Sequence, residues 1–177
     1  MKNGSNKAVF LDRDGTIIVD TGYIRDPDLV RFLPGALAGL KQLQDLGYVL
    51  VIISNQSGIG RGRITEDEYF SVQSRMIGEL SNNGVVISKS YFCPHAPEDG
   101  CSCRKPEPAM LLKAAGELDI DLNQSAMIGD KQPDVEAGML AGCKTILLAC
   151  DNHVYSGQPI YPDHVCPDWS AICEVLT

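Results

Sequence analysis

Short apolar runs alternate with helical patterns along most of this 177-residue chain, and this alternation restricts the fold more than any other feature. The clearest run, residues 48–54, is apolar at nearly every position, which is typical of a strand covered on both faces. Further strands are predicted at residues 9–11, 85–92, 125–129 and 143–148 and near Val165. Because helical patterns separate these runs, the sequence predicts an α/β fold with a doubly wound, Rossmann-like parallel sheet.

The helices are predicted from apolar residues that recur three or four positions apart. Pro34 opens the first helix and Gly47 ends it, with leucines at three-residue spacing between them. Thr65 and Glu68 form a capping box at the start of the second. Further helices are expected at residues 108–118, at 133–141 and from Asp168, and residues 150–163 predict a turn-rich segment.

Length and charge limit the functions that the chain can have. A chain of this length is expected to form one domain, residues 1–177. Its net charge of −8 and isoelectric point of about 4.8 oppose nonspecific binding to nucleic acid or to an anionic membrane. The sequence shows neither a membrane span nor a hydrophobic signal core, so a cytoplasmic location is expected. No apolar surface pattern indicates assembly, so a monomer is expected.

Two carboxylates follow the first predicted strand. Asp12 and Asp14 come directly after the apolar residues 9–11, and Gly15 ends the strand. They are therefore expected at the carboxyl end of a parallel strand, where open α/β sheets bind ligands. Two close carboxylates repel each other and bind Mg²⁺ well. An acidic turn is the alternative interpretation of this pattern alone.

Three later segments carry groups that suit a phosphoryl oxyanion or the Mg²⁺ that accompanies it. Ser54 and Asn55 follow the second predicted strand and offer a hydroxyl, an amide and backbone N–H groups in a glycine-containing loop. Lys105 is presented as a point charge by the turn at Pro106. Asp130 follows the strand at 125–129 and adds a third carboxylate at the same edge of the sheet.

Each of these segments also has a structural interpretation as a turn or a surface charge. Asp134 is interpreted as a helix cap that the helix dipole stabilises, because it lies in the first turn of a predicted helix. Arg61 and Arg63 follow the glycine-containing loop and either contact an anion or are solvated. The sequence leaves the role of these two arginines open.

Four potential metal ligands lie within eleven positions: Cys93, His95, Cys101 and Cys103. In a reducing compartment such a cluster indicates a metal before a disulfide. Three thiolates and one imidazole fill the four positions of a closed tetrahedral Zn²⁺ site, which is structural because it leaves no position for water. The other cysteines are interpreted as free, mostly buried thiols: Cys143, Cys150, Cys166 and Cys173.

Taken in order, these segments resemble the four motifs of the haloacid dehalogenase superfamily of phosphotransferases. The matching residues are Asp12-x-Asp14-Gly-Thr, Ser54-Asn55, Lys105 and Gly129-Asp130. The resemblance implies a phosphatase without a cap domain, because the interval between residues 16 and 34 is too short for one. Loops, including the zinc loop at 93–103, would then enclose the substrate.

The resemblance also implies a role for each core residue. Asp12 would be the nucleophile and Asp14 the general acid–base. Mg²⁺ would be held by the Asp12 and Asp130 side chains and by the backbone carbonyl of Asp14. Ser54 and Lys105 would stabilise the transferring phosphoryl group.

The cysteine-containing segment with Arg104 and Lys105 resembles two families within the superfamily, the heptose 1,7-bisphosphate phosphatases and the histidinol-phosphate phosphatases. Residues 20–23, 55–62 and 129–131 are similar to the heptose type. The substrate-binding residues carried over from it are Asp20, Thr21, Gly22, Tyr23, Ser54, Asn55, Gln56, Ser57, Arg104, Lys105 and Lys131.

Three functions are therefore considered. The resemblance implies removal of the C7 phosphate of a heptose bisphosphate in nucleotide-heptose, lipopolysaccharide or other glycan biosynthesis, with the anomer left open. Histidinol phosphate or another small sugar phosphate is the alternative substrate. A zinc-braced binding module without catalysis is the third interpretation, which the presence of all five core groups opposes.

Overall fold

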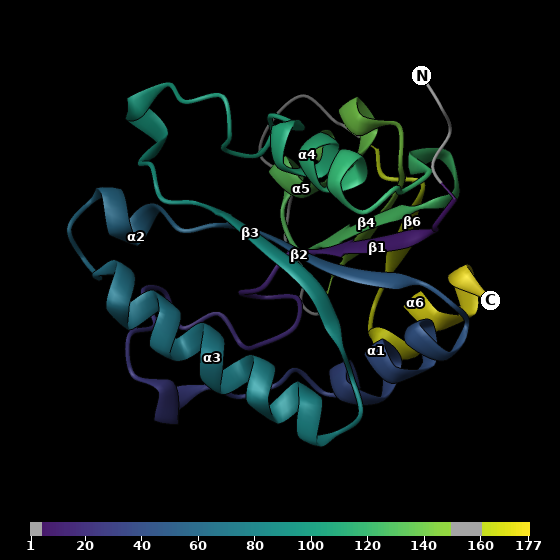
Figure 1. Cartoon of the computed structure of the whole chain (residues 1–177), viewed down its shortest axis with the longest axis horizontal. Helices are drawn as coiled ribbons and strands as arrows, with labels where there is room; N and C mark the ends of the chain where they lie inside the picture. Colours follow the sequence, from purple (N-terminus) through teal and green to yellow (C-terminus); the bar gives the residue numbers. More distant parts are fainter. Residues whose placement is uncertain (1–4, 150–160) are drawn as a thin grey trace.

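The computed structural model describes residues 5–149 and 161–177, which form a six-stranded parallel sheet with helices on both faces (Figure 1). The strands lie in the order β3-β2-β1-β4-β5-β6, so the chain starts near the middle and winds outward in both directions. This arrangement confirms the predicted doubly wound fold. The strands are β1 (Ala8–Leu11), β2 (Val49–Asn55), β3 (Ile87–Cys93), β4 (Ala126–Gly129), β5 (Lys144–Leu148) and β6 (His164–Cys166).

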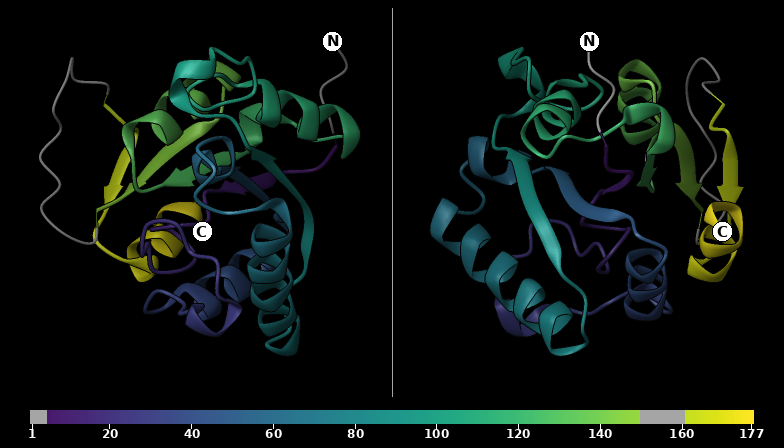
Figure 2. Two further views of the ribbon diagram at one scale, coloured as in Figure 1. Left: turned by 90° about the vertical axis from the view of Figure 1, so that its left-hand side faces the viewer. Right: turned by 45° about the vertical axis from the view of Figure 1, so that its right-hand side comes forward.

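The helices form two layers, which Figure 2 shows from two further sides. Helices α1, α3 and α6 pack in one apolar cluster on one face of the sheet, and α4 and α5 pack in a second cluster on the other. Their bounds are α1 (Ala36–Asp45), α2 (Ser57–Gly60), α3 (Glu66–Asn82), α4 (Ala109–Glu117), α5 (Gln132–Ala141) and α6 (Trp169–Leu176), and the 3₁₀ turns are η1 (Pro27–Leu29), η2 (Pro97–Asp99) and η3 (Leu122–Gln124).

The central strand β1 is buried on both faces. Val9 and Leu11 contribute to the α1/α3/α6 cluster, whereas Ala8 and Phe10 contribute to the α4/α5 cluster. Alternate side chains of a strand point to opposite faces, and both faces are covered here. This explains why the strand is apolar at every position.

Most predicted element boundaries are confirmed to within a few residues. Thr65 and Glu68 form the predicted capping box, with the Thr65 hydroxyl accepting from the Glu68 N–H at 3.1 Å. Helix α1 begins at Ala36 rather than at Pro34, because Gly35 adopts the left-handed conformation (φ 80°) at the N-cap. Helix α2 was not predicted, and part of the turn-rich segment, residues 150–160, lies outside the described residues.

Helix α6 contacts the loop that follows β1. The Trp169 indole N–H donates a 3.0 Å hydrogen bond to the backbone carbonyl of Thr16. Trp169 is 1% exposed and lies against Gly35 and Gly39, where an added Cβ would come within 3.2 and 2.7 Å of the tryptophan side chain. The last helix of the described chain therefore supports the loop that carries the paired aspartates.

Two further predictions concern the cysteines and the membrane. Cys143, Cys166 and Cys173 are free and buried, as predicted, whereas Cys150 lies outside the described residues. Within residues 5–149 and 161–177, the helices lack the combination of length and apolarity needed to cross a bilayer.

Candidate active site

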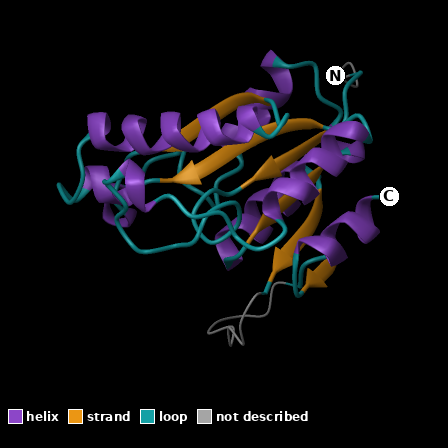
Figure 3. Cartoon of the chain, turned by 90° about the horizontal axis from the view of Figure 1, so that it is seen from below, coloured by secondary structure: helices purple, strands orange, loops and turns teal. Residues whose placement is uncertain are grey.

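The loops that follow β1, β2 and β4 meet at the carboxyl edge of the sheet, the end to which the strand arrows point in Figure 3. Asp12 follows β1 directly and Asp130 follows β4, as predicted. Asp134 joins them from the first turn of α5. One carboxylate oxygen of each of the three residues lies within 4.8 Å of the others.

Two glycines permit this close approach. A Cβ at Gly129 would lie 2.3 Å from the Asp134 side chain, and a Cβ at Gly15 would lie 2.3 Å from Asp130 Oδ2. Gly15 also has a φ of 89°, which other residues rarely adopt. The space that side chains would fill at these positions is occupied by the two carboxylates.

Lys105 lies at the centre of the site with its side chain only 1% exposed. Its Nζ is 2.8 Å from Asp12 Oδ1 and 2.6 Å from Asp134 Oδ1, and it donates to the carbonyl of Ile53. Burial disfavours the ammonium, but the attraction of Asp12 and Asp134 outweighs it, so the pKa of Lys105 is raised. The lysine therefore stays charged beside Asp12.

The interpretation of Asp134 as a helix cap was incomplete. Asp134 Oδ2 does accept a 3.1 Å hydrogen bond from the Lys131 N–H, as a cap should. Its other oxygen pairs with Lys105, which lies on a different loop. The residue therefore belongs to the site, and local sequence showed only half of its role.

The backbone of Lys105 is held by Asn55 at the end of β2. Asn55 Nδ2 donates to the Lys105 carbonyl and Asn55 Oδ1 accepts from the Lys105 N–H, each at 3.0 Å. The Asn55 side-chain amide thus pairs with the Lys105 backbone through one donor and one acceptor, as a neighbouring strand would. It fixes the loop that presents the lysine to the sheet.

Asp14 is held by two neighbours. The Arg13 guanidinium lies 2.9 Å from its carboxylate, and Gln56 Nε2 donates to Asp14 Oδ2 at 2.8 Å. Burial raises the pKa of Asp14 above its ordinary value, although Arg13 opposes the shift. Gln56 Nε2 also donates to Ser54 Oγ at 2.7 Å, so these polar groups form one network.

Asp130 is poised for a cation. Its Oδ1 is buried and has no hydrogen-bond partner among the described residues. Burial and the nearby Asp12 carboxylate raise the pKa of Asp130 to about 7. An unpaired buried oxygen beside two further carboxylates has the donor chemistry that Mg²⁺ prefers. The three aspartates therefore fit a divalent cation.

A cavity of about 340 Å³ opens above these groups. It brings together most of the predicted site residues and adds Gly58, Pro133 and Asp134. Of the predicted residues, Thr21, Ser54 and Asp130 do not contribute to the part of the wall that the structure describes. Its lining is Asp12, Asp14, Asp20, Gly22, Tyr23, Asn55, Gln56, Ser57, Gly58, Arg104, Lys105, Lys131, Pro133 and Asp134.

The three predicted residues that do not line the described cavity wall are missing from it for different reasons. Ser54 is buried behind Gln56, with which its hydroxyl bonds. Asp130 is mostly buried and lies against Gly15. Thr21 is exposed to solvent.

Cations surround the opening of the cavity. Lys131 pairs with Asp20 at 2.9 Å and with Asp130 at 3.1 Å. Arg104 lines the cavity and donates to the His95 carbonyl at 3.4 Å. These two side chains are placed to meet an anionic ligand.

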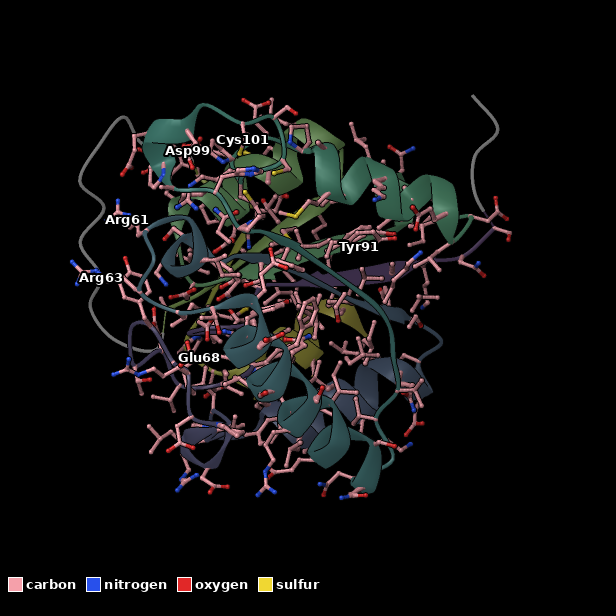
Figure 4. The ribbon with its side chains drawn as sticks, turned by 60° about the vertical axis from the view of Figure 1, so that its left-hand side comes forward. Arg61, Arg63, Glu68, Tyr91, Asp99 and Cys101 are labelled. Atoms are coloured by element: carbon pink, nitrogen blue, oxygen red, sulfur yellow. The ribbon has the colours of Figure 1, made fainter. Side chains whose placement is uncertain are left out.

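Arg61 and Arg63 lie beside the cavity rather than in it. They line an open hollow together with Tyr23 and Glu98, and Arg61 lies 3.5 Å from the Glu98 carboxylate. Figure 4 shows both arginine side chains pointing away from the sheet.

The predicted zinc ligands form a compact cluster. The Sγ atom of Cys93 lies 3.5 Å from that of Cys101 and 3.1 Å from that of Cys103, and His95 Nδ1 lies 3.3 Å from Cys103 Sγ. All four ligand atoms lie within 4.8 Å of one another. A tetrahedral metal–thiolate site has edges of roughly 3–4 Å, so the cluster could hold a metal ion.

Comparison with known proteins agrees with this geometry. Residues 102–172 match a family model described as HAD-hydrolase-like. The chain is 44% identical over 163 residues to D-glycero-β-D-manno-heptose-1,7-bisphosphate 7-phosphatase of Pasteurella multocida, covering 89% of this chain and 86% of the relative. The enzyme of the same name from Escherichia coli K12 is 40% identical over 163 residues, covering 88% and 83%.

Solved structures show the same relationship. The D,D-heptose 1,7-bisphosphate phosphatase of B. bronchiseptica, complexed with magnesium and phosphate, matches with a TM-score of 0.87 and 33% identity over 96% of this chain and 97% of the other. The enzyme from Burkholderia thailandensis matches with a TM-score of 0.72 and 26% identity, covering 96% and 97%. The chain is thus a phosphoric monoester hydrolase of the haloacid dehalogenase superfamily and belongs to the family of the heptose-bisphosphate phosphatases.

Proposed function

We propose that the chain removes the C7 phosphate of D-glycero-β-D-manno-heptose 1,7-bisphosphate. The observation that carries the chemistry is the placement of Asp12 and Asp14 in one cavity, with Lys105 paired to Asp12. The sugar and its β configuration are supported by the relatives that are 40–44% identical, whose names specify both. The reaction would serve nucleotide-heptose and lipopolysaccharide or other glycan biosynthesis.

The first step forms a phosphoaspartyl intermediate. A carboxylate oxygen of Asp12 attacks phosphorus, and the bond between phosphorus and the C7 oxygen breaks. Asp14 gives its proton to that oxygen, so the sugar leaves as an alcohol. Lys105 stabilises negative charge on the phosphoryl oxygens, and the Ser54 hydroxyl, whose oxygen accepts from Gln56, provides a further O–H donor.

The second step releases phosphate. A water oxygen attacks the phosphorus of the intermediate, and Asp14, now a carboxylate, accepts a water proton. The bond between phosphorus and the Asp12 oxygen breaks, which restores the Asp12 carboxylate and yields inorganic phosphate. The two steps together return both aspartates to their starting protonation states.

The proposed catalytic cofactor is Mg²⁺, held by the Asp12 and Asp130 side chains and the Asp14 backbone carbonyl. The unpaired buried Asp130 oxygen and the three clustered carboxylates support this site. When bound, Mg²⁺ screens Asp12 from the incoming phosphate and offsets charge on the phosphoryl oxygens.

The proposed structural metal is Zn²⁺ at Cys93, His95, Cys101 and Cys103. A set of three sulfurs and one ring nitrogen suits Zn²⁺ and leaves no position for water. The site lies directly before Arg104 and Lys105 in the chain, so it would brace the loop that carries both cations.

The cavity suits a small sugar phosphate. Its volume of about 340 Å³ lies at the lower end of the range for small-molecule sites. Arg104 and Lys131 would meet the second phosphate or the sugar hydroxyls, together with Asp20 and Tyr23. Of the other predicted substrate contacts, Gly22 and residues 55–57 line the described cavity wall, whereas Thr21 and Ser54 do not.

We further propose a cytoplasmic, monomeric, single-domain protein that binds neither nucleic acid nor membrane. The negative net charge supports the absence of nonspecific polyanion binding. The buried free thiols of Cys143, Cys166 and Cys173 suit a reducing compartment.

The test is phosphate release with Mg²⁺ from both anomers of heptose 1,7-bisphosphate and from histidinol phosphate. We expect turnover of the β anomer that is lost in Asp12→Asn. Preference for the α anomer or for histidinol phosphate would keep the chemistry and overturn the substrate. Turnover that survives in Asp12→Asn would overturn the mechanism.

A further inference from the structure

Arg13 lies between the two aspartates but takes no part in the steps above. Its side chain is buried, with only 1% exposed, although arginine usually reaches solvent. Burying a guanidinium is costly unless every donor has a partner. The partners of Arg13 therefore indicate what the residue is for.

The first partner is Asp14. Arg13 Nε donates to Asp14 Oδ2 at 3.0 Å, and Nη2 donates to Oδ1 at 3.1 Å. Two parallel bonds from a planar guanidinium fix both the position and the rotation of a carboxylate. The acid–base is thus held by its immediate neighbour in the chain.

The second partner is Gln56, whose Oε1 accepts from Arg13 Nη2 at 3.2 Å. This bond turns the amide so that its NH₂ group faces Asp14 and Ser54, to which it donates at 2.8 and 2.7 Å. Arg13 therefore orients a cavity-lining side chain as well as the carboxylate.

Helix α3 holds the guanidinium from the far side. Gln73 Oε1 lies 3.5 Å from Arg13 Nη1, and Gln73 Nε2 donates to Ser90 Oγ of β3 at 3.1 Å. The Tyr69 ring lies 5.1 Å from the guanidinium carbon, within cation–π range. The contacts run from β3 and α3 to the catalytic loop.

We propose that Arg13 is a positioning residue, which holds the Asp14 carboxylate where it can exchange a proton with the leaving oxygen. This inference rests on the proposed function, because it assumes that Asp14 is the acid–base. Lysine cannot substitute, since a single ammonium cannot hold both Asp14 oxygens and Gln56 in one plane. Gln73 and Tyr69 act through Arg13 and not on the substrate.

Substrates with different leaving groups distinguish a positioning role of Arg13 from a purely structural role. A sugar oxygen is a poor leaving group and needs the proton from Asp14, whereas p-nitrophenolate leaves without one. A misplaced Asp14 should therefore slow the first step with the sugar bisphosphate much more than with p-nitrophenyl phosphate. Loss of folded protein would reduce both rates equally.

The experiment is a single-turnover measurement with enzyme in excess, which reports the first step alone. Arg13→Lys should slow formation of the sugar monophosphate on the order of 10- to 100-fold, a fraction of the usual general-acid contribution. Release of p-nitrophenolate should change by less than about threefold. In steady state, kcat for the sugar bisphosphate should fall while KM stays within about twofold.

Matched variants complete the design. Arg75→Lys is the control, because Arg75 lies on α3 but is exposed and pairs with Glu79 of the same helix. Gln73→Met should give a smaller defect of the same kind as Arg13→Lys. Equal loss for both substrates in Arg13→Lys, or wild-type rates with the sugar bisphosphate, would overturn the inference. Wild-type inactivity toward the sugar would instead refute the proposed function.

Discussion

The two candidate metal sites of this chain are built in opposite ways. The carboxylate cluster of Asp12, Asp130 and Asp134 takes its residues from two segments far apart in sequence, and the ends of β1 and β4 hold them together. The thiolate cluster of residues 93–103 comes from one continuous segment, the last residue of β3 and the loop that follows it. A site made by a sheet keeps its shape without metal, whereas a site made by a loop depends on the metal for its shape.

The charges of the two clusters sharpen this contrast. The carboxylates already have a cation, because Lys105 pairs with Asp12 and Asp134. In the cysteine cluster, the contacts given by the described residues are those of the sulfur atoms with one another and with His95. We therefore expect metal removal to affect activity at the first site and stability at the second.

The largest effect is expected at the thiolate cluster. Cys103→Ser should lower the free energy of unfolding by several kcal/mol, because a structural metal contributes folding free energy directly. Chemical unfolding together with measurement of bound zinc checks this. Cys143→Ser is the control, since Cys143 is a buried cysteine outside the cluster and its loss should leave the zinc content unchanged. Full stability of zinc-free protein would remove the contrast between the two sites.

Lys105→Met should have the next largest effect. It leaves Asp12 and Asp134 buried without their counter-charge, and breaking a buried pair in this way costs about 3–5 kcal/mol. Catalysis should also fall, since the ammonium beside the nucleophile is lost. Unfolding in urea and a phosphate-release assay measure the two effects. Unchanged stability would show that the carboxylates are not held by the lysine.

Asp130→Asn should stabilise the protein in buffer without Mg²⁺ while abolishing activity. The folded protein keeps the Asp130 proton up to about pH 7, whereas an unfolded chain releases it near pH 4. The wild type therefore loses stability as the pH rises through this window, and asparagine does not. We expect a gain on the order of 1–3 kcal/mol at about pH 8 that disappears by about pH 4. A gain independent of pH would contradict this.

Asn55→Ala should have the smallest of these effects on stability. It removes the two hydrogen bonds to the Lys105 backbone and should cost about 1–2 kcal/mol. If these two hydrogen bonds position Lys105 beside Asp12, the lysine will also be less well placed in the variant and kcat will fall. Thermal melting and steady-state kinetics test this, with Asn83→Ala as a control because the Asn83 side chain donates to the Glu79 carbonyl at the end of its own helix.

Local patterns predicted the sheet well because the four inner strands, β2, β1, β4 and β5, are buried at nearly every position. The run at 48–54 and the residues around Asp12 and Asp130 follow from burial and from the position of loops at strand ends. Helix α2 escaped prediction because its four residues, two of them glycine, show no apolar period. Sequence periodicity detects elements that are long enough to bury one face.

The missed parts of the site depend on contacts between distant segments. Asp134 looked like a cap because only the fold brings it to Lys105. The buried bonds of Arg13 to Gln56 and Gln73 likewise join three segments that sequence spacing does not relate. The sequence signal that could have revealed such partners is a charged residue directly after a buried strand, because its side chain then needs buried partners.

The position of Trp169 has a practical consequence. It is the only tryptophan in the sequence, and its indole N–H bonds to the Thr16 carbonyl in the loop that follows Asp12 and Asp14. The tryptophan fluorescence of the protein therefore comes from a single buried ring attached to the catalytic loop. Changes in the emission of this ring should report ligand binding at the loop without any added label.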